Sequence, residues 1–334
     1  MRSLLAAALL TAFAAVCGAA LPAGAAQRIT ITVPSVDPDQ GAFFIAAQKG
    51  YFAAEGLEVE FVYAGGGVAT PGLISGSVDG SASSASALTA ILRGAPLRIV
   101  MVFEDSPPYG IWASGDIHSL ADLKGKSVGI ATRGDTFEIA TRLALIAAGL
   151  SPDSVAYTPL GTGGTGAPAL ASGALPAAVL SPTEVVALQD QGQLKNAHMI
   201  ADFSGRVRMP FAGFAMSEKL IESDPALVKK IVRAIVKGAR YEKAFKSQTI
   251  AIVGKYQKPV AHPHASEVEY RYVMKAMTPD LTFRDDLIAS DLAVRANLIG
   301  LAKDQIPPVD KIYDFSIVRA VNAELDAAHW KPIP

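Results

Sequence analysis

Short polar loops that follow predicted strands carry the side chains best suited to hold a small molecule. In open α/β sheets, ligands bind beyond the carboxyl ends of the strands, beside helix N-termini whose free N–H groups attract anions. Any one of these residues could instead be an ordinary helix cap, but some of them together should line a cleft. The candidate ligand-binding residues are Ser35, Asp37, Gln40, Phe43, Gly66, Gly67, Ser83, Ser84, Thr132, Arg133, Asp135, Thr136, Ser181 and Thr183.

Arg133 is the candidate with the most specific chemistry. A guanidinium beside a helix N-terminus could hold a carboxylate, sulfonate or phosphate through two parallel hydrogen bonds. The alternative is a surface ion pair with Asp135, two residues further along. Three aromatic residues, Tyr109, Trp112 and Phe211, could stack on a planar ligand or simply pack inside a hinge.

Other motifs do not support catalysis, a cofactor or a metal. Residues 161–166 spell G-x-G-x-x-G, with Glu184 further on, but Pro159 and Pro168 interrupt the strand and helix that a dinucleotide site needs. A glycine-rich cleft loop is the preferred interpretation. His262-Pro263-His264 lacks a third ligand at metal spacing. Ser83-Ser84 lacks the glycines of a nucleophile elbow, so we predict no catalytic residue.

The composition is that of a folded α/β protein. Of the 334 residues, 50% are hydrophobic and 18% are charged, which excludes a disordered chain. The 30 basic and 31 acidic residues nearly cancel, so a nucleic-acid partner is not expected. The single cysteine excludes a disulfide framework and a cysteine-rich metal site. The 29 glycines and 21 prolines punctuate many short strand–turn–helix units.

The N-terminus resembles an export signal. Arg2 precedes an apolar run over 4–20, which is followed by small residues over 23–26. This pattern predicts a secretory signal peptide cleaved near Ala25 or Ala26, and a periplasmic protein. The alternatives are an uncleaved membrane anchor and lipidation at Cys17.

Strand and helix signals alternate through two successive blocks. Strands are predicted over 28–34, 57–63, 78–81 and 97–103, with helices over 37–52, 70–75 and 85–93 between them. A second block repeats the order, with strands over 127–131, 155–158 and 177–180 and helices over 136–148 and 167–171. After Phe214 helices dominate, over 224–246, 266–277, 288–302 and 315–327.

The two blocks predict two α/β lobes. We expect the first to contain residues 27–113 and 214–334, and the second to be inserted as residues 114–213. The chain would then cross between lobes near Trp112–Ser114 and Gly213–Ala215. Two crossings make a hinge, and the cleft between the lobes is the expected ligand site.

Five motifs occur in register, in the segments 41–60, 75–80, 94–97, 120–129 and 145–155. On these segments the chain resembles the extracytoplasmic solute-binding proteins of the sulfonate, nitrate and thiamine-pyrimidine importers, the NMT1/THI5-like or SsuA-like family. One departure is Ser172–Pro176, where the second lobe's counterpart of the Ser-Gly-x-Val-Asp turn has no aspartate.

The resemblance implies a type II periplasmic-binding-protein fold that delivers a ligand to an ABC permease. The expected ligand is a small organic anion or a planar, pyrimidine-like heterocycle, held by a monomer that closes around it. One alternative is an enzyme that makes the thiamine pyrimidine, but that branch of the family uses a cysteine-rich segment that this chain lacks. The other is a module that senses a ligand without transporting it.

Overall fold

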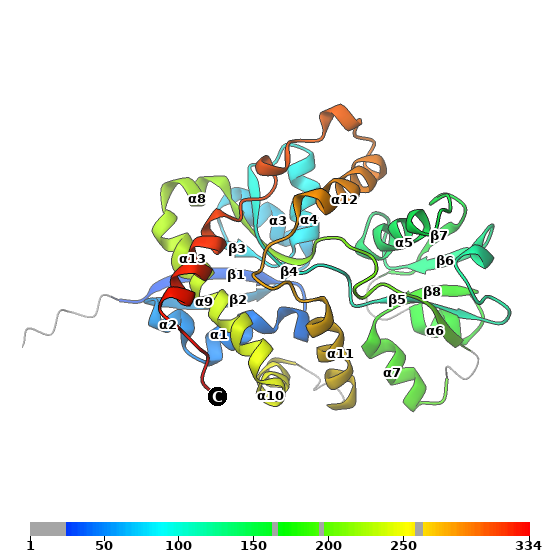
Figure 1. Ribbon diagram of the computed structural model, residues 1–334, viewed down its shortest axis with the longest axis horizontal. Helices are drawn as coiled ribbons and strands as arrows, with labels where there is room; N and C mark the ends of the chain where they lie inside the picture. The colour runs from blue at the N-terminus through cyan, green and yellow to red at the C-terminus, as the bar shows by residue number, and fades with distance from the viewer. Residues whose placement is uncertain (1–24, 162–165, 194–196, 258–262) are drawn as a thin grey trace, which may run out of the picture.

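The computed structural model describes residues 25–161, 166–193, 197–257 and 263–334. The predicted signal peptide, Cys17, His262 and the centre of the 161–166 glycine motif lie outside the described residues. Two α/β lobes stand side by side, each built on a five-stranded sheet (Figure 1). Among the described residues, no helix is long and apolar enough to span a bilayer.

The first lobe contains the sheet β2-β1-β3-β10-β4. Strand β1 pairs in parallel with β2 and β3, whereas β10 runs antiparallel to β3 and β4. The strands are β1 (Gln27–Val33), β2 (Leu57–Tyr63), β3 (Gly80–Ser81), β4 (Leu97–Glu104) and β10 (Phe211–Ser217). The helices are η1 (Pro38–Gln40), α1 (Gly41–Gln48), α2 (Tyr51–Ala54), α3 (Gly66–Ser75) and α4 (Ser84–Leu92).

The second lobe repeats this arrangement in the sheet β7-β6-β8-β5-β9. Three parallel strands are followed by β5, which runs antiparallel to β8 and β9. The strands are β5 (Gly110–Ser114), β6 (Ser127–Ile130), β7 (Ala156–Pro159), β8 (Ala177–Leu180) and β9 (Ala197–Asp202). The helices are η2 (Ala121–Leu123), α5 (Thr136–Ala147), α6 (Gly166–Ala171) and α7 (Pro182–Asp190).

The C-terminal third is helical, as the sequence predicts. Helix α9 begins where Asp224 accepts a hydrogen bond from the Leu227 N–H and Pro225 occupies the first turn. The helix packs closely on α1, because Gly238 has no side chain to push away the Ala42 carbonyl that faces it. The elements are α8 (Glu218–Ser223), α9 (Pro225–Ala244), α10 (Lys246–Tyr256), α11 (Pro263–Ala276), α12 (Asp285–Leu298), η3 (Lys303–Gln305), η4 (Val309–Lys311) and α13 (Ser316–Ala327).

The chain changes sheets at different points from those that the sequence indicates. The expected crossings near Trp112–Ser114 and Gly213–Ala215 fall inside β5 and β10. The sheets are linked instead by residues 105–109 and 203–210. Pro107 and Pro108 explain the first crossing, because proline has no N–H to continue a strand ladder.

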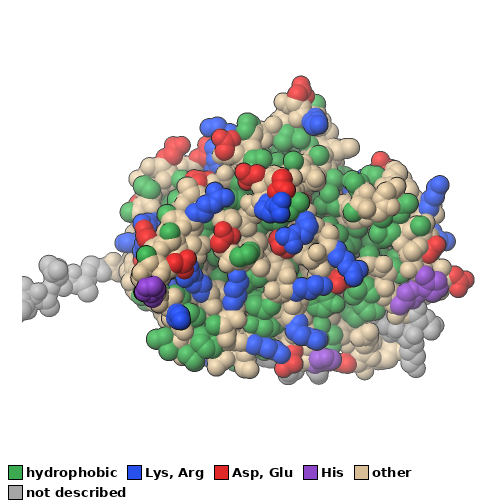
Figure 2. Space-filling view, viewed as in Figure 1, with side chains coloured by type: hydrophobic (Ala, Val, Ile, Leu, Met, Phe, Trp, Pro, Cys, Tyr) green, Lys and Arg blue, Asp and Glu red, His purple; other side chains and the backbone are tan. Residues whose placement is uncertain are grey.

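Two C-terminal helices also touch the second lobe. Helix α11 lies against α7, and α12 lies against α5 (Figure 1). Val186 of α7 packs with Ala265 and Val268 of α11, which forms a small apolar cluster between the lobes. On the face shown in Figure 2, acidic and basic side chains are interspersed, consistent with the near-zero net charge.

Candidate functional site

Two cavities lie between the lobes. The first, here called the acidic pocket, has a volume of about 610 Å³, and the carboxyl ends of strands from both sheets meet around it. That volume is typical of small-molecule sites. Its lining residues are Pro34, Ser35, Asp37, Asp39, Pro108, Tyr109, Gly129, Ile130, Ala131, Phe137, Leu160, Gly161, Gly166, Val179, Ser181, Glu184 and Glu269.

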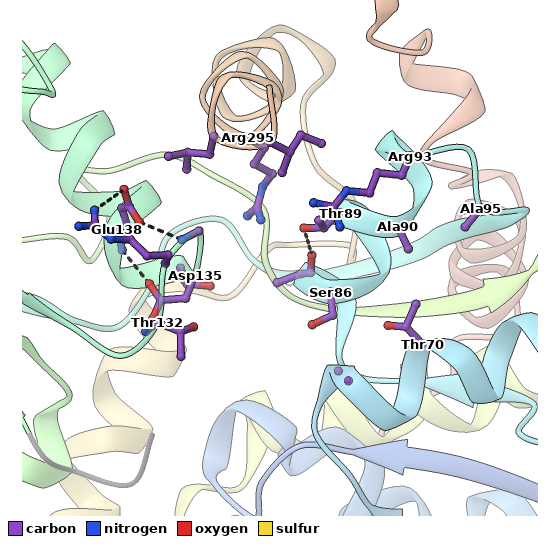
Figure 3. A pocket seen from close by; sticks show the side chains of 18 of the residues that line it. Thr70, Ser86, Thr89, Ala90, Arg93, Ala95, Thr132, Asp135, Glu138 and Arg295 are labelled. Carbon is purple, nitrogen blue, oxygen red and sulfur yellow. Dashed lines mark hydrogen bonds and ion pairs between the residues drawn. The ribbon is translucent and has the colours of Figure 1, made fainter. Parts of the chain in front are cut away.

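The second cavity, here called the arginine pocket, has a volume of about 1100 Å³ (Figure 3). It lies between α3 and α4 of the first lobe and the β6–α5 loop of the second, with α12 alongside. Ala131 lines the acidic pocket and Thr132 lines the arginine pocket, so the cavities flank the same loop. The charged and hydroxyl residues that line the arginine pocket are Thr70, Ser86, Thr89, Arg93, Thr132, Arg133, Asp135, Thr136, Glu138, Arg142 and Arg295.

Three carboxyl groups converge in the acidic pocket. One oxygen each from Asp37, Asp39 and Glu269 lies within 4.8 Å of the others. Asp37 caps η1 and Asp39 lies within it, because Pro38 starts a helical turn directly between them. Glu269 comes from α11, more than 220 residues later in the chain. Oxygen ligands at this spacing could hold a cation, either a metal ion or an organic one.

Burial raises the pKa of all three carboxyl groups. It raises the pKa of Asp39 to about 7, and the nearby charge of Asp37 adds to that shift. The pKa of Asp37 is also raised by burial, against a hydrogen bond from Ser35. Burial raises the pKa of Glu269 well above its usual range, and the two aspartates raise it further.

Two more carboxyl groups lie behind the pocket. Glu104 is fully buried at the end of β4, and neither of its carboxyl oxygens has a hydrogen-bond partner. Burial raises its pKa well above the usual range, and the charges of Asp39 and Glu242 add to the effect. Glu242 is 1% exposed, with one oxygen unpartnered, and lies close against Gly41 at the start of α1.

Aromatic rings form one wall of the acidic pocket. Tyr109 packs edge-on against Phe137, with ring centroids 4.7 Å apart, and against Phe211 at 5.4 Å. Tyr109 and Phe137 line the pocket, whereas Phe211 lies behind Tyr109. Trp112, the third aromatic candidate, packs in the core of the second lobe with residues such as Leu180.

Two of the four arginines that line the arginine pocket, Arg142 and Arg295, are paired with carboxylates, whereas Arg93 and Arg133 are exposed. Arg142 donates to Glu138 and to Asp153, both at 2.8 Å. Arg295, only 3% exposed, reaches into the pocket from α12 (Figure 3) and donates from Nε to Asp291 at 2.8 Å. A guanidinium held in this way is largely neutralised by its partner.

The surface ion pair between Arg133 and Asp135, the alternative that the sequence left open, does not form. Both Asp135 oxygens cap the chain instead, accepting from the Glu138 N–H at 2.9 Å and the Thr132 N–H at 2.7 Å. The side chain of Arg133 is 60% exposed and lies 3.8 Å from Glu138. It lines the arginine pocket, so an anion that entered there could reach it.

The structure divides the candidate residues between the two pockets. Ser35, Asp37 and Ser181 line the acidic pocket, as do Gly161 and Gly166 at the ends of the glycine motif. The candidates that line the arginine pocket are Gly66, Gly67, Thr132, Arg133, Asp135 and Thr136.

The other candidates line neither pocket. Phe43 is fully buried in the first lobe, where its ring lies 5.3 Å from Phe103. Gln40 is 3% exposed and donates a hydrogen bond to Asp39. Ser83 is 8% exposed, and Ser84 borders a small separate cavity. Thr183 lies in α7, but its side chain is outside the described residues.

The sequence analysis missed most of the carboxyl groups. Asp39 could have been noticed, because Asp37-Pro38-Asp39 places two acids around a helix start. Glu104, Glu242 and Glu269 have no local signal, since each lies within an ordinary strand or helix pattern. Only the folded chain brings them to one place.

Comparisons with known proteins identify relatives and similar structures. The family model described as "NMT1/THI5 like" matches residues 37–246. The riboflavin-binding protein RibY of Chloroflexus aurantiacus is 33% identical over 221 residues, which cover 64% of this chain and 61% of that protein.

Two of the similar solved structures are periplasmic binding proteins. The aliphatic sulphonate-binding protein SsuA of Escherichia coli has a TM-score of 0.63 at 17% identity, over 86% of this chain and 91% of that one. The nitrate-binding protein NrtA of Synechocystis PCC 6803 has a TM-score of 0.63 at 15% identity, over 92% of this chain and 90% of that one. These likenesses and the two sheets confirm the expected two-lobed type II periplasmic-binding-protein fold.

Proposed function

This chain belongs to the NMT1/THI5-like family, and on that premise we propose that it is the substrate-binding component of an ABC importer. The observation that carries the proposal is the acidic pocket, which draws its lining from both lobes. A solute bound there contacts Ser35 and Asp37 on one side and Phe137 and Ser181 on the other. Contacts with both lobes favour the closed arrangement over the open one.

The proposed mechanism is rotation of the lobes about the two linking segments, residues 105–109 and 203–210. Tyr109 lies in the first segment and also lines the pocket, so a solute packed on its ring contacts the hinge directly. The closed form then docks on the permease and releases its solute there. We propose that the protein acts in the periplasm as a monomer, exported by residues 1–26 with cleavage near Ala25 or Ala26, and has no catalytic activity.

The lining of the acidic pocket favours a planar, pyrimidine-like heterocycle over an anion. Two aromatic rings offer flat apolar surface, and hydrogen-bond acceptors surround it. Among the described lining residues none is Lys or Arg, so an anion would meet only like charge.

An anion such as a sulfonate, nitrate or carboxylate is the second candidate solute, held in the arginine pocket. The observation that favours it is Arg133, whose exposed guanidinium lies near the N-terminus of α5. The N-terminus of α3, at Gly66 and Gly67, faces the same cavity.

Native mass spectrometry of freshly purified protein tests the function. We expect one retained small molecule per chain, lost after unfolding and refolding. Small-angle scattering should then show a smaller radius of gyration when that molecule is added back. The proposal would be wrong if no retained mass is found and scattering stays unchanged with sulfonates, nitrate, carboxylates and nitrogen heterocycles alike.

A further inference from the structure

Buried hydrogen-bond acceptors that have no donor lie in the acidic pocket, at Asp39, and directly behind it. In folded proteins, nearly all buried polar atoms have a hydrogen-bond partner. Here Oδ1 of Asp39, Oε1 of Gln40 and both carboxyl oxygens of Glu104 are buried and have none. The donors that satisfy such a set must come from ordered water, from a bound molecule or from protons on the carboxyl groups themselves.

Gln40 does not line the pocket, but it places one more buried acceptor without a donor beside Asp39 of the carboxyl cluster. Gln40 is only 3% exposed, and its Nε2 donates a hydrogen bond to Oδ2 of Asp39 at 3.2 Å. The amide is therefore aimed at the carboxyl cluster. Its Oε1 is left without a partner, although an amide buried for structural reasons would be expected to use both of its polar atoms.

We infer that the solute carries a protonated nitrogen base, such as an amidinium on a flat ring, and that Asp37, Asp39 and Glu269 bind its N–H groups. This inference rests on the proposed function and deepens it by naming the charge of the solute. A planar cation with several N–H donors matches carboxylate oxygens two at a time. Its ring would lie against Tyr109 and Phe137, the aromatic wall of the same pocket.

An organic cation fits the pocket better than a metal ion. A volume of about 610 Å³ is far larger than a single ion requires, and a metal would leave the aromatic wall uncovered. One oxygen of Asp39 already accepts a hydrogen bond from the Gln40 amide, which weakens it as a metal ligand. A cation of either kind would restore the ionised form of these carboxyl groups, whose pKa values burial has raised.

The experiment compares three probes of the same shape with different charge. Benzamidinium is a flat cation, benzamide is its neutral counterpart, and benzenesulfonate is an anion. Titration calorimetry on the full mature protein should show benzamidinium binding about tenfold or more tightly than benzamide, with no binding of benzenesulfonate at the acidic pocket.

Variants locate the binding. Asp39→Asn and Glu269→Gln should each weaken benzamidinium about tenfold or more, because a charged hydrogen-bond partner becomes neutral. Glu267→Gln is the matched control, since Glu267 also lies on α11 but its side chain is 58% exposed. Circular dichroism should show all three variants folded, because Asp39→Asn and Glu269→Gln remove repulsion between acids and Glu267 is exposed.

Four results would overturn the inference. They are no benzamidinium binding at millimolar concentration, equal binding of benzamide, unchanged affinity in both variants, and binding of Zn²⁺ or Ca²⁺ alone in place of benzamidinium. The proposed function is separable from this outcome. If the retained solute lacks a basic nitrogen but still closes the lobes, the inference fails and the importer role stands.

Discussion

The acidic and arginine pockets flank the same loop, yet their buried charges differ, since those of the arginine pocket are paired within the protein and those of the acidic pocket are not. In the arginine pocket, Arg142 and Arg295 are bonded to carboxylates of their own surroundings. In the acidic pocket, Asp37, Asp39 and Glu269 face one another without a cation among the described lining residues. Paired charges hold the fold together, whereas unpaired ones cost folding free energy and indicate a ligand that supplies the missing charge.

The largest expected effect tests whether the arginine pocket is structural. Arg295→Ala leaves Asp291 fully buried without its partner, and should lower the free energy of unfolding by about 3 to 5 kcal/mol. Urea unfolding followed by circular dichroism measures this. The control is Arg284→Ala at the N-cap of the same helix, whose exposed pair with Asp286 should contribute far less than the buried pair. Equal losses in both variants would contradict the assignment of Arg295 to structure.

The next effect is the pH dependence caused by the acidic pocket. Asp39 has a pKa of about 7 in the folded protein and an ordinary value of 3.8 when exposed, so the folded state binds more protons between those values. Stability of the ligand-free protein should therefore fall as pH rises from 4 to 7. The full pKa shift of Asp39 corresponds to a loss of about 4 kcal/mol in the free energy of unfolding. We expect a loss of roughly half that size, because the cleft is partly solvated.

Asp39→Asn should flatten that pH profile. Urea midpoints at pH 4.5, 6 and 8 for the wild-type and variant proteins check this, with Glu267→Gln as the control. A profile that rises with pH, or that Asp39→Asn leaves unchanged, would show that another group dominates. The titratable or charged groups that face Asp39 and could share the slope are Asp37, Glu104, Glu242, Glu269, Tyr109 and, next to Glu242, Lys243.

A smaller effect concerns the two glycines at the mouth of the arginine pocket. A Cβ on Gly66 would lie 1.8 Å from the Ser86 hydroxyl oxygen, so Gly66→Ala should force α3 away from α4 and cost about 1 to 3 kcal/mol. Gly67→Ala meets nothing within 4 Å and should be neutral or stabilise by less than about 1 kcal/mol. Thermal unfolding distinguishes the two, and equal shifts would show that the close helix packing is not what requires Gly66.

The smallest expected effect is at Arg133. If the solute is a cation in the acidic pocket, Arg133→Ala should leave both its affinity and the stability of the protein within about 0.5 kcal/mol, because the side chain is exposed and loosely paired. Calorimetric titration with the retained solute measures the affinity. A several-fold loss would instead favour the anion hypothesis and reverse the roles of the two pockets.

Much of the fold could be predicted because its signals are local. The β-branched run before Pro34 gives β1, Asp224-Pro225 starts α9, and the repeated strand–helix order gives two similar sheets. The predicted helices after Phe214 all appear, with ends shifted by a few residues, although α8 and α10 were not predicted. The switch of β5 into the second sheet was missed, because a strand's own residues do not specify which sheet it joins.

The sequence by itself determined the α/β class, the family, most of the alternating strand and helix order before β5 and several of the loops that border the interlobe cleft. It did so because caps, periodicity and turn residues act over a few positions. Only the tertiary structure decided that these loops divide between two pockets, and that Glu269 completes a cluster begun by Asp37 and Asp39. The physical reason is that unpaired charge depends on what surrounds a side chain in space, and the residues next to it in the chain do not reveal those surroundings.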